Sequence, residues 1–111
     1  MILYHITTLD RTEGIVENGI RPDMAVGRAK VSWWVEEDWI EWAIIHVSGR
    51  HHVPTDYLVI FTLEMNVDIG DLSTMGFRRF QRGRWMRMLV TVDCEWMAVE
   101  KYMLQSEKAN P

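Results

Sequence analysis

The sequence predicts an α+β fold: a small split sheet, mixed or antiparallel, of about five or six strands with two helices. Short stretches rich in β-branched and aromatic residues recur along the chain, and only two segments have convincing helical character. A steady strand–helix–strand alternation is missing, which disfavours a doubly wound parallel sheet. The chain has 111 residues, of which 48% are apolar, so we expect one domain over residues 1–104 and a flexible C-terminal tail over residues 105–111.

The first half of the chain predicts three elements. Residues 2–7 have the β-branched and aromatic composition of a short buried strand. A helix is expected over residues 9–18, because Gly19 follows it where a glycine commonly ends a helix. Residues 30–35 form a second predicted strand, in which Trp33 and Trp34 face opposite sides.

The strongest predicted helix covers residues 36–48. Acidic residues fill its first turn, which suits the positive end of the helix dipole. Apolar residues then recur at the spacing of one helical face. This core stripe consists of Ile40, Ala43, Ile44 and Val47.

The second half predicts its elements less sharply. Residues 57–65 are apolar enough for a central strand, and residues 85–92 predict another. Residues 66–83 are punctuated by glycines and predict a long irregular loop, a feature that is often functional. Residues 96–104 fit either a fifth strand or a short helix.

Composition favours a cytoplasmic protein. The only cysteine, Cys94, cannot form an internal disulfide, and the N-terminal residues lack the pattern of a signal peptide. No apolar run approaches the length that spans a bilayer, so no membrane association is expected. No metal is expected either, because the histidines lack the spacing of a ligand set.

Charge is distributed unevenly, although the net charge is only −4. One block is acidic and contains Glu36, Glu37, Asp38 and Glu41. Another is basic and contains Arg78, Arg79, Arg82, Arg84 and Arg87. These blocks are either two solvated faces or, for the arginines, a site for a phosphate or pyrophosphate.

A series of short motifs runs in order through the first half of the chain. Its members are Leu3-Tyr4-His5-Ile6-Thr7, Ile15, Gly19-Ile20-Arg21-Pro22 and Val31-Ser32-Trp33-Trp34. This series resembles the opening of ADP-ribosyltransferase-like domains, which include DNA- and protein-modifying toxins, rifampin-modifying enzymes and RNA 2′-phosphotransferases. In that family a strand with a His-x-Thr-like element precedes a helix that ends in Gly-Ile or Gly-Leu, and the next strand faces the nicotinamide pocket. The resemblance covers approximately residues 1–48.

The resemblance implies NAD as a co-substrate and assigns roles to individual residues. Cleavage of the nicotinamide–ribose bond passes through an oxocarbenium-like state, as glycoside cleavage does. His5 would contact the ribose beside the reacting bond, and Thr7 would hold its other side. Ser32 or Trp33 would bracket the nicotinamide. The pyrophosphate would bind two arginines of the basic block, Arg78 and Arg79.

The family's late acidic residue has no clear counterpart. Active members carry a Glu, Gln or Asp at the head of a late strand, but the matching strand here begins with Trp85-Met86-Arg87. Gln81 just upstream and Glu95 beyond the strand are the candidate replacements, and Arg87 is a third occupant of that position.

Two functions are therefore expected from the sequence. The first is an NAD-dependent mono-ADP-ribosyltransferase that acts on a protein or nucleic-acid acceptor. The second is a catalytically lapsed relative that works by binding, such as a phage- or mobile-element-encoded inhibitor of a host nucleic-acid-handling complex. Its contact surface would comprise Glu36, Glu37, Asp38, Trp39 and Trp42. The partner would be a host protein or nucleoprotein complex, because the negative net charge disfavours direct nucleic-acid contact.

Overall fold

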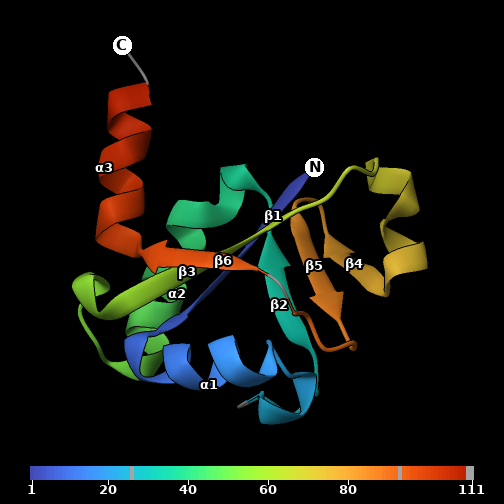
Figure 1. Ribbon diagram of the computed structural model, residues 1–111, viewed down its shortest axis with the longest axis horizontal. Coiled ribbons are helices and arrows are strands. Elements are labelled where there is room, and N and C mark those ends of the chain that lie inside the picture. Colours follow the sequence, from blue (N-terminus) through green and yellow to red (C-terminus); the bar gives the residue numbers. More distant parts are fainter. Residues whose placement is uncertain (26, 93, 110–111) are drawn as a thin grey trace.

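One six-stranded antiparallel sheet organises the chain (Figure 1). The computed structural model describes residues 1–25, 27–92 and 94–109. The strands lie in the order β4-β5-β2-β1-β3-β6, and each neighbouring pair is antiparallel. Their bounds are β1 (Ile2–Thr8), β2 (Ser32–Val35), β3 (Leu58–Glu64), β4 (Phe77–Gln81), β5 (Arg84–Arg87) and β6 (Glu95–Ala98). The predicted α+β class is thus confirmed, with an antiparallel sheet.

Helices and short 3-10 turns cover both faces of the sheet. The α-helices are α1 (Thr12–Asn18), α2 (Ile40–His51) and α3 (Val99–Ala109). The 3-10 turns used below are η1 (Leu9–Arg11), η3 (Glu37–Trp39) and η5 (Ile69–Met75). Within the described part of the chain, none of the helices has the length and apolar character needed to cross a bilayer.

Alternation along the strands builds two apolar cores. In β1, Leu3 faces one side, while Tyr4 and Ile6 face the other. The Tyr4 side packs against α2 and α3. The Leu3 side packs against Ile20, against Leu72 of η5 and against the central rings of the sheet, Trp34, Phe61, Phe77 and Trp85.

Three expectations about the elements require correction. The described residues form three α-helices rather than two, because the segment expected as a strand or a short helix is both: β6 leads directly into α3. The stretch expected to be irregular, residues 66–83, contains η5 and the edge strand β4. The strand expected over residues 85–92 ends at Arg87, and Thr91 makes only an isolated bridge to Ile20.

The C-terminal boundary also differs from the expectation. Helix α3 runs past residue 104 to Ala109, and in its first part Val99 and Tyr102 pack against the core beside α2. Part of the expected tail is therefore helical. Residues 110–111 lie outside the described residues.

The sheet is split between β1 and β2. These central strands share a single ladder pair, Tyr4 with Val35. By contrast, β1 pairs with β3 along its whole length, and β2 pairs with β5 along its whole length. The sheet therefore consists of two three-stranded halves, β4-β5-β2 and β1-β3-β6, which separate beyond that pair.

Candidate functional site

A cavity of about 700 Å³ opens where β1 and β2 separate. Its walls come from both strands, from α1 and α2, and from the ends of β4 and β5. The volume lies in the range of small-molecule and cofactor sites. Four residues expected to bind NAD line it together: His5, Thr7, Ser32 and Trp33.

His5 bridges the split. Its Nδ1 lies 2.7 Å from the carbonyl oxygen of Trp33. A carbonyl only accepts, so Nδ1 carries the proton in the neutral ring and Nε2 is left as an acceptor. Burial lowers the pKa of His5, the hydrogen bond to the Trp33 carbonyl opposes this in part, and the positive charge of Arg11 adds to the lowering. His5 is thus a neutral hydrogen-bond acceptor at neutral pH, suited to a ribose hydroxyl.

The hydroxyl of Ser32 is already engaged in the fold. It accepts a hydrogen bond from Trp34 Nε1 at 2.9 Å and donates to the carbonyl oxygen of Arg87 at 3.3 Å. Ser32 and Thr7 are both buried, whereas Trp33 is 38% exposed. Of these side chains, Trp33 offers the accessible aromatic surface, and its ring meets Phe80 edge to face at 5.1 Å.

Arg84 is surrounded by aromatic rings at one wall of the cavity. Its guanidinium carbon lies 4.1 Å from the ring centre of Trp42 and 4.9 Å from that of Phe80. Trp39 and Trp33 complete the enclosure at 5.6 and 5.8 Å. We call these four rings and Arg84 the arginine box. Such contacts stabilise a cation without neutralising it.

Two features of Arg84 would favour an anionic ligand beside it. Its Nε is buried and has no hydrogen-bond partner among the described residues. Desolvation also lowers the pKa of Arg84, because burial disfavours the charged form. An anionic ligand in the cavity would supply both the missing acceptor and the missing charge.

The arginines expected to bind pyrophosphate lie elsewhere. Arg78 and Arg79 are exposed on the edge strand β4, and neither lines the cavity. Arg79 instead stacks over Trp85, at 5.7 Å from the ring centre. The sequence did contain a signal for Arg84, since Arg82-Gly83 is a two-residue turn of the hairpin type that brings the following residue back beside β4.

The expected catalytic replacements also lie outside the cavity. Gln81 is exposed at the end of β4, and Glu95 is exposed on β6, the opposite edge strand. Arg87 donates to the carbonyl oxygen of Met75 and to Thr91 Oγ1. Among the described lining residues the carboxylate belongs to Asp10 of η1, which the sequence reasoning did not single out.

The residues expected to contact a partner differ in their surroundings. Glu36 accepts a hydrogen bond from Trp85 Nε1 at 3.1 Å, while Glu37 and Asp38 are exposed on η3. The tryptophans turn toward the arginine box, where Trp39 and Trp42 meet at 83° with centres 5.5 Å apart. Trp42 also stacks on His46, with ring centres 4.8 Å apart.

The cavity combines aromatic surface with positive charge. Arg11, Arg50 and Arg84 line it, as does Arg21, which is paired with Asp23 at 2.6 Å. Planar rings and cations together suit a ligand that carries an aromatic base and phosphate groups.

Comparison of the chain with protein-family models, curated proteins and solved structures found no match.

Proposed function

We propose that the protein binds NAD in the split-sheet cavity and transfers ADP-ribose to a protein or nucleic-acid acceptor in the cytoplasm. The observation that carries the proposal is the convergence of His5, Trp33 and Arg84 on one cavity of about 700 Å³. Each supplies a different part of what NAD requires: a ribose contact, a stacking surface and a cation.

The arrangement suggests how the reaction would proceed. The nicotinamide would stack on Trp33, the ribose would donate a hydroxyl hydrogen bond to His5 Nε2, and the pyrophosphate would bind Arg84. The ribose C1′–nitrogen bond breaks, and its electron pair leaves with nicotinamide. The acceptor nucleophile then bonds to C1′, and its proton passes to the Asp10 carboxylate.

A second candidate is binding without catalysis. It is favoured by the placement of Gln81 and Glu95 outside the cavity. A lapsed transferase would keep the ligand-binding residues and act on a host protein or nucleoprotein complex. In that case NAD would bind without being consumed.

Ligand binding is tested first by thermal unfolding with and without NAD. At NAD about one hundred times its Kd, the folded state gains about 2.7 kcal/mol, which shifts Tm visibly. Arg84→Met should remove most of this shift, while Arg78→Met, the matched change outside the cavity, should preserve it. Loss of the shift in both variants or in neither would contradict the assignment of Arg84.

Catalysis is tested by nicotinamide release from NAD. His5→Ala should slow release at least tenfold, which requires the loss of only about 1.4 kcal/mol of transition-state stabilisation. Asp10→Asn should slow the transfer of ADP-ribose to the acceptor, the step in which Asp10 takes the proton, and keep the NAD-dependent Tm shift. Wild-type protein that is stabilised by NAD but releases nothing would favour the binding function, and protein that shows neither effect would rule out both.

A further inference from the structure

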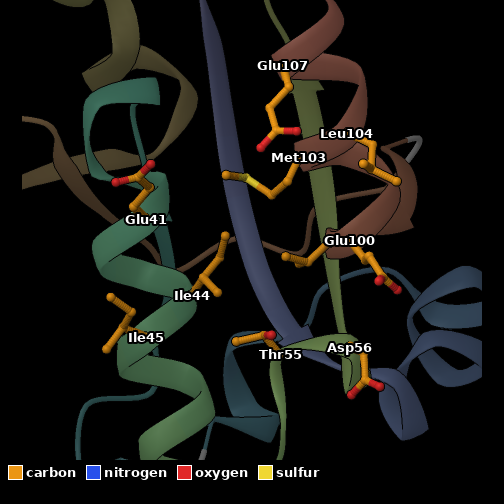
Figure 2. Close-up of a pocket in the computed structure, with 10 residues that line it drawn as sticks. Glu41, Ile44, Ile45, Thr55, Asp56, Glu100, Met103, Leu104 and Glu107 are labelled. Carbon is orange, nitrogen blue, oxygen red and sulfur yellow. The ribbon is translucent and has the colours of Figure 1, made fainter.

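A second groove lies between α2 and α3 (Figure 2). It is lined by other residues of α2 than the split-sheet cavity. Its volume is about 410 Å³. Ile44 of α2 and Met103 of α3 enter it from its two sides (Figure 2). Val99, at the start of α3, also lines it and is buried. The groove therefore has an apolar floor between two helical walls.

Two exposed apolar side chains also border this groove. Ile45 on α2 is 71% exposed, and Leu104 on α3 is 54% exposed. Each would lose water contact if another molecule filled the groove. Single exposed apolar residues are ordinary, but these two flank a shared apolar depression.

The rim of the groove carries charge of one sign. Its carboxylates are Glu41, Asp56, Glu100 and Glu107. They come from α2, from the segment before β3 and from α3, so they surround the apolar floor (Figure 2). Among the described lining residues there is no lysine, arginine or histidine. An occupant must therefore be apolar at its centre and cationic at its edges.

We propose that this α2–α3 groove docks a basic amphipathic helix of another protein. Apolar residues at helical spacing would fill the floor between Ile44 and Met103, and flanking lysines or arginines would meet the carboxylate rim. The same rim repels nucleic acid and anionic membranes, and it repels a second copy of this chain, whose net charge is −4. This binding function is independent of the NAD cavity.

The test uses fluorescence anisotropy with two labelled peptides of about 15 residues, long enough to form a helix on the surface. Both carry leucines at helical spacing, and they differ in having either lysine or glutamate on the flanks. The folded full-length protein should bind the lysine peptide, with an affinity that falls as salt is raised. It should not bind the glutamate peptide.

Variants assign the binding to the groove. Ile45→Ser with Leu104→Ser should weaken binding at least tenfold, about 1.4 kcal/mol, without unfolding the protein because both side chains are exposed. Val16→Ser is the matched control, since Val16 is 63% exposed on α1. Glu100→Gln with Glu107→Gln should reduce the salt dependence.

Several results would overturn the proposal. They are failure to bind the lysine peptide, equal binding of both peptides, and unchanged affinity in the Ile45/Leu104 variant. Concentration-dependent dimerisation that this variant abolishes would instead identify a second copy of the chain as the occupant.

Discussion

Substitution of Gly83 by alanine should destabilise the protein by a predictable amount. Gly83 has φ +83° in the turn between β4 and β5, a conformation that side-chain-bearing residues rarely adopt. A Cβ atom there would lie 2.3 Å from Trp39 Cδ1 and 2.4 Å from its Nε1. The left-handed backbone costs about 1 kcal/mol. Displacing the packed indole adds about 2 kcal/mol.

The total of about 3 kcal/mol should lower Tm by roughly 10–20 °C in a domain of this size. Thermal unfolding followed by circular dichroism measures it. The control is Gly70→Ala, because a Cβ at Gly70 meets nothing within 4 Å. Trp39 belongs to the arginine box, so Gly83→Ala should also weaken NAD binding. A Tm for Gly83→Ala within about 3 °C of the Gly70→Ala value would refute this geometry, since even 1 kcal/mol shifts Tm by about 4 °C or more.

Three further predictions concern stability. The pKa of the half-buried His5 is lower in the folded protein than in the unfolded chain, so as pH falls below about 6.5 the unfolded chain binds the proton first. The free energy of unfolding should therefore fall by up to about 1.4 kcal/mol per pH unit until the native pKa is reached, and His5→Gln should flatten this slope in urea unfolding. Ser32→Ala should cost about 2 kcal/mol in the same assay, because it leaves the buried Trp34 Nε1 unpaired; an unchanged midpoint would show that the bond is dispensable. Gly49→Ala should stabilise α2 by about 0.5–1 kcal/mol and so raise Tm, because a Cβ atom added at Gly49 would meet nothing within 4 Å.

The early strands and α2 were predictable because their sequence patterns match their burial. Ile40, Ala43 and Ile44 recur at helical spacing and are all buried in the structure. Strand β4 was missed because Phe77 is its only buried residue. An edge strand with one buried side chain shows little of the apolar alternation by which strands are predicted. The spacing of apolar residues thus predicts elements that bury a continuous row of apolar side chains, such as α2. It does not predict an element such as β4, which buries a single side chain.

The candidate site was predictable only in part, for a related reason. His5 and Trp33 lie on adjacent strands, so the series of short motifs was enough to predict that they line the same site. Charge alone did not distinguish Arg84 from Arg78 and Arg79. The three arginines differ in position, because Arg78 and Arg79 lie on β4 and Arg84 follows the turn onto β5. Its aromatic neighbours come from β2, η3, α2 and β4, and only the tertiary fold assembles them.

Because β4 lies at the edge of the sheet, its two arginines, Arg78 and Arg79, affect the solubility of the protein. An edge strand exposes backbone groups that can pair with a strand of another molecule. Here Arg78 and Arg79 are exposed on that edge, and the register shifts between Arg79 and Gln81. Two such edges brought together would place the positive charges of Arg78 and Arg79 of both molecules close to one another. Replacing both arginines with threonine would keep the strand's β-propensity but remove this repulsion, and concentrated protein would then be prone to edge-to-edge aggregation.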